Sequence, residues 1–230
     1  MNLIIDAGNT CIKLAAFKGD DPVEVCRVDY DELSKFGRFT TSYPFRRGIV
    51  SSVVDMPQSL EAAIAALPFD VVRLVPGVTP VPLRIKYATP HTLGADRLAA
   101  AVGAYAKGEG REVLVIDMGT CITYDFVNAD GEYLGGNISP GPKLRLKALN
   151  AYTSRLPLVS RHGDIPEMGD STETAIRSGV VNGIRREIEG YISDFLLKYP
   201  RLFVYLTGGV HLDLHISEKM RIFADDFIVP

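Results

Sequence analysis

The chain is poor in cysteine, has no excess of basic residues and contains no long apolar run. Its 230 residues include three cysteines, Cys11, Cys26 and Cys121. Their odd number and the absence of CxxC spacing predict neither a disulfide framework nor a cysteine zinc site, and fit a reducing cytoplasm. No segment approaches the roughly 18 apolar residues of a membrane span, and the opening LIIDAG resembles a strand rather than a secretory leader. We therefore expect a cytoplasmic protein that does not span a membrane.

A formal net charge of -3 gives no electrostatic basis for binding nucleic acid or an anionic membrane, because such proteins present a basic face or stripe. Two phosphate-binding signatures are also absent. The sequence has no GxxxxGK[ST] loop and no GxGxxG after a strand, so neither a P-loop protein nor a dinucleotide-binding domain is predicted. With 47% hydrophobic residues the chain can bury a sizeable core. Because the charge does not favour nucleic acid or membranes, we expect small molecules or other proteins as its partners.

Strand and helix patterns alternate along the chain, and the series begins twice. The predicted strands are residues 2–6, 11–17, 23–29, 46–54, 69–75, 112–117, 121–127, 132–138, 202–207 and 226–229, with one more short strand between 75 and 94. The predicted helices are residues 56–67, 95–107, 142–150, about 172–198 and a last one that ends near 220. Because GEG at 108–110 marks a boundary, we expect an α/β protein with one domain at residues 1–108 and another at 109–230.

One segment occurs twice in slightly different form. LIIDAGNTCIKLAAF at residues 3–17 returns as VLVIDMGTCITYDFV at residues 113–127. Each copy has an apolar run, an aspartate, a variable residue, a glycine and a threonine-containing turn before a second alternating run, which is the pattern of a β-hairpin with an acidic bend. Asp6 and Asp117 stand about half the chain apart. Self-similarity at this spacing is typical of a duplicated structural unit.

The residue types in this repeat suit a magnesium nucleotide. Gly8 and Gly119 allow backbone N–H groups to approach an anion without a Cβ in the way. An aspartate at the strand end can bind a hard cation, and Lys13 can pair with phosphate. Further hydroxyl donors are Thr10, Thr120 and Thr123. A single D-x-G at a strand end is usually only a turn, but two copies at half-chain spacing favour two hairpins that bind one magnesium triphosphate.

Six segments, in order, resemble motifs of the type III pantothenate kinases, a family of the actin-like ATPase and sugar-kinase superfamily. They are DAGNTCIK (6–13), YATPHTLGADR (87–97), DMGTCIT (117–123), GEYLGGNISPG (131–141), STETAIRSGV (171–180) and LTGGV (206–210). The resemblance implies a two-lobed, duplicated ribonuclease-H-like fold with mixed sheets and an interlobe cleft. Ser171 stands where the family commonly has asparagine, and Cys121 where a small residue such as alanine is usual. Both residues are small, so we expect activity to be retained.

The resemblance also implies a reaction and its site residues. ATP and pantothenate would be the substrates, Mg2+ would accompany ATP, a monovalent K+ or NH4+ would lie near the second hairpin, and the protein would be a homodimer. Asp96 would be the general base at the primary hydroxyl of pantothenate, and Asp6 and Asp117 would hold cations. Pantothenate would be bound by Tyr87, Gly94, Ala95, Asp96, Arg97 and, across the dimer interface, Thr172. ATP and its phosphates would be bound by Asp6, Ala7, Gly8, Asn9, Thr10, Cys11, Ile12, Lys13, Gly119, Thr120, Gly208 and Gly209.

Several of these residues have simpler alternative roles at the level of sequence. Asp96 has the position of an ordinary helix-start aspartate stabilised by the helix dipole, and Arg97 that of a solvated helix arginine. Thr172 could cap the long helix, and Tyr87 could be a surface-loop tyrosine. The PKLRLK run at 142–147 is predicted to be a solvated helix face rather than an anion site.

Two other functions are compatible with parts of the pattern. A kinase for another small hydroxy acid or sugar would keep both hairpins but need not keep the segment at 87–97. A nucleotide-binding transcriptional accessory or regulatory protein of the same fold could lose Asp96, which is present here. A zinc site at His211 and His215 lacks a third ligand. The sequence therefore favours pantothenate phosphorylation, the first step of coenzyme A synthesis.

Overall fold

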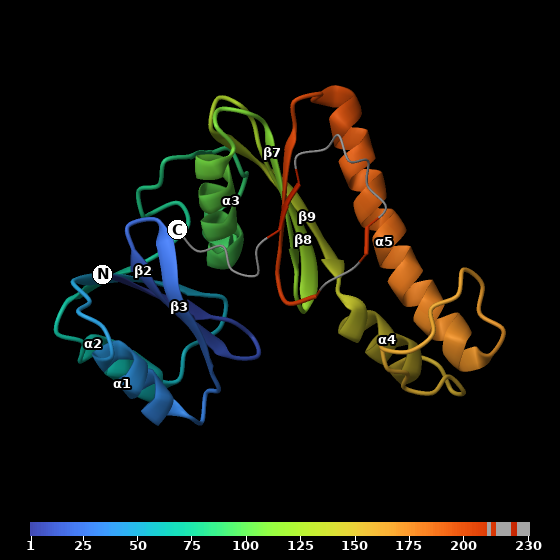
Figure 1. The fold of residues 1–230 in the computed structure, drawn as a ribbon, viewed down its shortest axis with the longest axis horizontal. Helices are drawn as coiled ribbons and strands as arrows, with labels where there is room; N and C mark the ends of the chain where they lie inside the picture. Colours follow the sequence, from blue (N-terminus) through green and yellow to red (C-terminus); the bar gives the residue numbers. More distant parts are fainter. Residues whose placement is uncertain (211–212, 215–221, 225–230) are drawn as a thin grey trace. The chain divides into compact units, whose positions relative to one another are not determined.

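The computed structural model describes residues 1–210, 213–214 and 222–224 in two compact units. The first is Met1–Gly103 and the second begins at Ala104, so the division falls inside helix α3 (Ala95–Lys107). Each unit contains a mixed β-sheet with helices, which can be followed in Figure 1. The predicted α/β class with two mixed sheets is therefore confirmed, whereas a domain division at residue 108 remains a prediction.

The sheet of the first unit has the strand order β3-β2-β1-β4-β5. Its strands are β1 (Asn2–Ala7), β2 (Ile12–Lys18), β3 (Asp21–Val28), β4 (Arg47–Ser52) and β5 (Asp70–Arg73). The first three form an antiparallel meander, whereas β4 runs parallel to β1, and β5 parallel to β4. The other elements are α1 (Leu33–Thr41), α2 (Gln58–Ala65), the short strand β6 (Arg84–Ile85) and a 3-10 helix (Pro90–Thr92). Helices follow the meander because parallel neighbours need crossover connections.

The second unit repeats this topology. In the described residues its sheet contains, in spatial order, β9-β8-β7-β10-β11. The strands are β7 (Val113–Met118), β8 (Cys121–Val127), β9 (Glu132–Pro140), β10 (Phe203–Thr207) and β11 (Ile222–Ala224). Again the first three are antiparallel, and the last two run parallel to their inner neighbours. The helices are α4 (Pro142–Ala151) and α5 (Thr172–Lys198). The duplication predicted from the repeated segment is thus confirmed at the level of strand order and direction.

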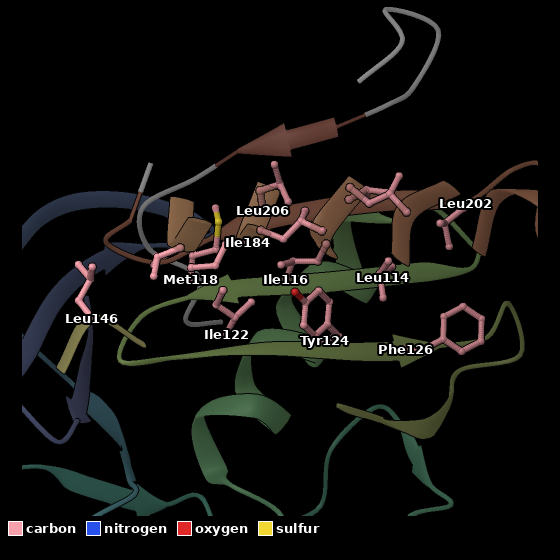
Figure 2. Packing of buried hydrophobic residues seen from close by; sticks show 14 of the residues in the cluster. Leu114, Ile116, Met118, Ile122, Tyr124, Phe126, Leu146, Ile184, Leu202 and Leu206 are labelled. Carbon is pink, nitrogen blue, oxygen red and sulfur yellow. The ribbon is translucent and has the colours of Figure 1, made fainter. Parts of the chain in front are cut away.

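Helix α5 is held on the second sheet by a row of isoleucines. Ile184, Ile188 and Ile192 recur every four residues and are buried in one cluster with apolar side chains of β7, β8 and β10, part of which is shown in Figure 2. Burying each such side chain contributes about 1.5–3 kcal/mol. The polar residues that α5 carries beside this row therefore have fixed positions relative to the sheet.

Helix α1 is absent from the predicted elements. Its segment, LSKFGRFTT, contains Gly37, Thr40 and Thr41, residue types with low helix propensity. Tertiary packing outweighs that propensity, because Phe36 and Phe39 are buried in the core cluster of the first unit. Its apolar residues Leu33, Phe36 and Phe39 nevertheless recur at helical spacing, so the segment carries a helix pattern that its low propensity obscures.

The other predicted elements agree with the described ones to within a few residues, and α3 has the predicted bounds. The C-terminal end differs. The predicted strand at 226–229 lies outside the described residues, as does most of the helix predicted to end near 220. Residues 213–214 of that helix are described and are not helical. Strand β11 occupies positions for which no strand was predicted.

Candidate active site

The first repeated hairpin surrounds Asp6 with polar side chains. In the sheet register Asp6 lies opposite Lys13 of β2 and Ser51 of β4. The Nζ atom of Lys13 lies 3.5 Å from Oδ2 of Asp6, and the Ser51 hydroxyl donates to Oδ1 at 3.0 Å. The Asp6 side chain is 13% exposed. The Lys13 ammonium and the Ser51 hydroxyl therefore orient this carboxylate. It remains partly exposed, so a metal ion could bind it.

Backbone groups close the turn of this hairpin. The N–H of Gly8 donates to the carbonyl of Cys11 at 3.2 Å, and the hydroxyl of Tyr30 donates to the carbonyl of Gly8 at 2.7 Å. Burial, together with the nearby Asp6 and Cys11, raises the pKa of Tyr30, so its hydroxyl remains a donor at neutral pH. This hydrogen bond connects the chain that follows β3 to the turn, and no local sequence pattern predicts it.

The predicted phosphate-binding residues of this turn differ in what they can offer. Asn9 and Thr10 are exposed, so their side chains can reach a ligand. Ala7 and Ile12 are fully buried, so they can contribute only backbone groups. Asn9 and Thr10 lie in the bend between the two strands, whereas Ala7 ends β1 and Ile12 begins β2.

The second hairpin repeats this arrangement around Asp117. Asp117 of β7 lies opposite Thr123 of β8 and Thr207 of β10. The N–H of Gly119 donates to the carbonyl of Cys121 at 2.9 Å, as the N–H of Gly8 does in the first copy. Each hairpin therefore presents a carboxylate flanked by a hydroxyl residue on the neighbouring parallel strand.

The glycine turn after β10 lies directly against the second hairpin. Gly208 has a φ of 100°, and a Cβ there would lie 2.4 Å from the carbonyl oxygen of Met118 and 2.5 Å from Oδ1 of Asp117. The N–H of Val210 donates to the same Met118 carbonyl at 3.1 Å. The structure thus brings Gly208 beside Asp117, while Gly209 is the exposed residue of the turn.

The segment predicted to bind pantothenate folds around the start of α3. Oδ1 of Asp96 accepts a hydrogen bond from the Arg97 N–H at 2.7 Å, and a Cβ on Gly94 would lie 2.5 Å from that oxygen. Arg97 is only 6% exposed, and its guanidinium carbon lies 5.9 Å from the ring centroid of Tyr87. The alternative that Arg97 is a solvated helix arginine is therefore wrong. Ala95, the first residue of α3, is buried.

These three regions carry residue types that phosphoryl transfer requires. Two carboxylates stand beside glycine turns, a lysine accompanies one of them, and an aspartate and a buried arginine share one helix start. A model of the type III pantothenate kinase family matches residues 2–194. A type III pantothenate kinase of Phocaeicola vulgatus is 48% identical over 229 residues, which cover 100% of this chain and 94% of that one. The chain belongs to the type III pantothenate kinase family.

Two solved structures have a similar fold. A Baf family transcriptional activator from Campylobacter jejuni superimposes with a TM-score of 0.61 at 20% identity, covering 97% of this chain and 91% of that one. A 2-dehydro-3-deoxygalactonokinase protein from Sinorhizobium meliloti superimposes with a TM-score of 0.53 at 12% identity, with coverages of 97% and 94%. At these identities the likeness shows the fold alone, which is that of the actin-like ATPases and sugar kinases.

Asp6 and Asp117 each offer the carboxylate oxygens that a divalent cation accompanying ATP would take. Mg2+ usually binds through one or two carboxylates, and phosphate oxygens and waters complete its shell. Among the described residues there is no group of three or more His, Cys, Asp and Glu side chains that could hold a metal ion by themselves. His211 and His215 lie outside the described residues. In the part of the chain that the structure describes, no helix has the length and apolar character needed to cross a membrane.

Thr172 is the first residue of α5, and its side chain is exposed. The helix cap is its neighbour Ser171, whose hydroxyl accepts from the Thr174 N–H at 3.2 Å within a capping box. The alternative that Thr172 caps the helix is therefore wrong. Its exposed hydroxyl is available for the binding role predicted for this family, whereas Ser171 is used for helix stability.

Ser171→Ala should lower the free energy of unfolding by about 1 kcal/mol, because the capping hydroxyl is lost. Thr172→Ala, the matched change at the next position, should alter it by less than about 0.5 kcal/mol. Urea denaturation of both variants measures this difference. Equal effects would contradict the assignment of the cap to Ser171.

One polar network of this kinase has no local signature in the sequence. Arg145 belongs to the PKLRLK run that was predicted to be a solvated helix face. Lys143 and Lys147 are exposed as predicted, but the Arg145 side chain is only 23% exposed and is paired with Glu187. The periodicity of the run gave no signal, because its partners lie on other elements.

Proposed function

We propose that the protein transfers the γ-phosphoryl group of ATP to the primary hydroxyl of pantothenate, giving 4′-phosphopantothenate and ADP. This is the first step of coenzyme A synthesis. The observation that carries the proposal is membership of the type III pantothenate kinase family over the whole chain. The start of α3 supports it, because a family-specific segment there holds Asp96 against Arg97 and Gly94.

In this proposal Asp96 accepts the proton of the pantothenate hydroxyl as the oxygen–phosphorus bond forms and the bond to the ADP oxygen breaks. Arg97 binds the pantothenate carboxylate, since a buried guanidinium suits a paired anion. Tyr87 lies beside that guanidinium and shapes the same pocket. Gly94 leaves room for the Asp96 carboxylate.

The two hairpins bind the nucleotide in this proposal. Lys13 and the turns at Gly8 and Gly119 each bind phosphate oxygens, and Gly208 and Gly209 border the nucleoside side. Mg2+ held by Asp6 and Asp117 would neutralise charge that develops on the phosphates. We also propose a monovalent cation, K+ or NH4+, near the second hairpin.

Three further assignments belong to the same proposal. The chain forms two ribonuclease-H-like domains that divide near residue 108. The active form is a homodimer in which Thr172, exposed at the start of α5, reaches the pantothenate site of the partner. The reaction takes place in the cytoplasm, for which the three free cysteines are suited.

The proposal is tested by incubating the purified protein with ATP, Mg2+, K+ and pantothenate and detecting phosphopantothenate by mass spectrometry. We expect product in proportion to protein and time. A parallel reaction with NH4+ in place of K+ tests the monovalent cation. Absence of product with either cation would overturn the proposal and would favour another small hydroxy acid or sugar as the acceptor, which the same assay can screen.

A further inference from the structure

Arg145 joins three elements of the second unit. From α4 its Nε donates to the carbonyl of Pro140 at 2.7 Å, and its Nη2 donates to the hydroxyl of Ser139 at 2.6 Å. Both acceptors lie at the end of β9. Nη2 also donates to Oε2 of Glu187 on α5 at 2.5 Å. The end of β9 is thus fixed by an arginine that is itself fixed by the longest helix of the described chain.

Glu187 is held in turn by the sheet. The Tyr124 hydroxyl on β8 donates to its Oε1 at 2.8 Å. Partial burial would raise the pKa of Glu187, but the hydrogen bonds from Arg145, Ser139 and Tyr124 outweigh it and lower that pKa. The pKa of Tyr124 is raised, first by burial and then by the hydrogen bond to Glu187. The carboxylate is therefore ionised and the phenol is protonated at neutral pH. Glu187 accepts hydrogen bonds from Arg145 and Tyr124 in this state.

The peptide that Arg145 holds is in contact with the second phosphate hairpin. Pro140 pairs with Cys121 in the sheet register, and the Gly141 N–H donates to the carbonyl of Thr120 at 3.0 Å. A Cβ on Gly141 would lie 2.5 Å from the carbonyl oxygen of Gly119 and 2.6 Å from that of Thr120. Such close approach means that any movement of the Pro140–Gly141 peptide would move the Gly119–Thr120 turn.

We propose that Arg145 and Glu187 are positioning residues for nucleotide binding. They hold the Pro140–Gly141 peptide, and through it the turn at Gly119–Thr120, in the geometry that receives a phosphate group. Neither residue needs to touch the nucleotide. The inference rests on the proposed function only in that the second hairpin binds phosphate.

The test is a titration of each variant with Mg·AMPPNP, followed through the phosphorus NMR signals of the nucleotide. Arg145→Met should weaken binding about tenfold, the change expected when about 1.4 kcal/mol of charge-assisted hydrogen bonding is lost. Arg145→Lys should weaken binding about threefold, because a single ammonium group cannot reach all the acceptors that the guanidinium contacts. In steady-state kinetics KM for ATP should rise, while KM for pantothenate changes by less than about twofold, because neither Asp96 nor Arg97 belongs to the network.

Arg186→Met is the matched control. Arg186 precedes Glu187 on α5 and pairs at 3.7 Å with Glu167, but these side chains are 58% and 85% exposed. Exposed pairs contribute little, so affinity should not change. Equal loss in Arg186→Met and Arg145→Met, or unchanged affinity in a folded Arg145→Met and in Arg145→Lys, would overturn the inference.

Two outcomes separate this inference from the proposed function. Binding of Mg·AMPPNP by the wild type without formation of phosphopantothenate would overturn the proposed acceptor and leave the inference to be decided by the variants. No binding by the wild type would overturn the inference itself. If Arg145→Met does not fold, as judged by circular dichroism, Arg145→Lys and Ser139→Ala decide, and wild-type affinity in both would overturn it.

Discussion

Asp96→Asn is expected to lower the rate of phosphate transfer to pantothenate at least roughly a hundredfold, since a general base contributes about 10²–10⁴-fold. Asparagine has nearly the same shape but cannot take the hydroxyl proton. Its side-chain oxygen can still accept from the Arg97 N–H, as Oδ1 of Asp96 does at 2.7 Å, so the start of α3 should keep its structure. The measurement is the initial rate of phosphopantothenate formation at saturating ATP and pantothenate.

Asp20→Asn is the control for this change. Asp20 is exposed in the turn between β2 and β3, so the variant loses the same charge without touching α3, and its rate should equal that of the wild type. Thermal denaturation of both variants confirms that they are folded. A folded Asp96→Asn protein with the wild-type rate would remove Asp96 from the role of base.

The hairpins could be predicted from the sequence because their chemistry is local. Asp6 and Gly8 are two positions apart, as are Asp117 and Gly119, so strand, bend and carboxylate can be identified within one short segment. The duplication adds a second copy, and the matching strand orders of the two units follow from it. These features depend on spacing along the chain and not on distant contacts.

The residues that the sequence did not reveal depend on distant partners. Arg145 resembles any solvated helix arginine until Glu187, 42 positions later, is seen to pair with it. Tyr30 reaches the Gly8 carbonyl from 22 positions away. Helix α1 is a comparable case, because burial of Phe36 and Phe39 decides its structure against local propensity. Periodicity reports which face is apolar, but it carries no information on which polar group another element supplies.

Gly208→Ala is expected to lower the free energy of unfolding by roughly 3 kcal/mol, because it combines a strained backbone with overpacking. The φ of 100° at this position is one that side-chain-bearing residues rarely adopt. The new methyl group would also lie 2.4 Å from the Met118 carbonyl oxygen and 2.5 Å from Oδ1 of Asp117. Urea denaturation measures the loss of stability.

The same variant should bind Mg·AMPPNP at least about tenfold more weakly, since the methyl group displaces the Asp117 carboxylate or the glycine turn. Gly190→Ala is the matched control. Gly190 lies within α5, and a Cβ there would meet no atom within 4 Å, so alanine should stabilise the protein by about 0.5–1 kcal/mol and leave nucleotide binding unchanged. If alanine lowers the free energy of unfolding at position 208 and raises it at position 190, glycine is required at position 208 because the turn after β10 approaches Asp117 closely. If Gly208→Ala were as stable as the wild type and bound nucleotide equally well, the turn would have to tolerate a shift away from Met118, and the nucleotide site would not depend on this contact.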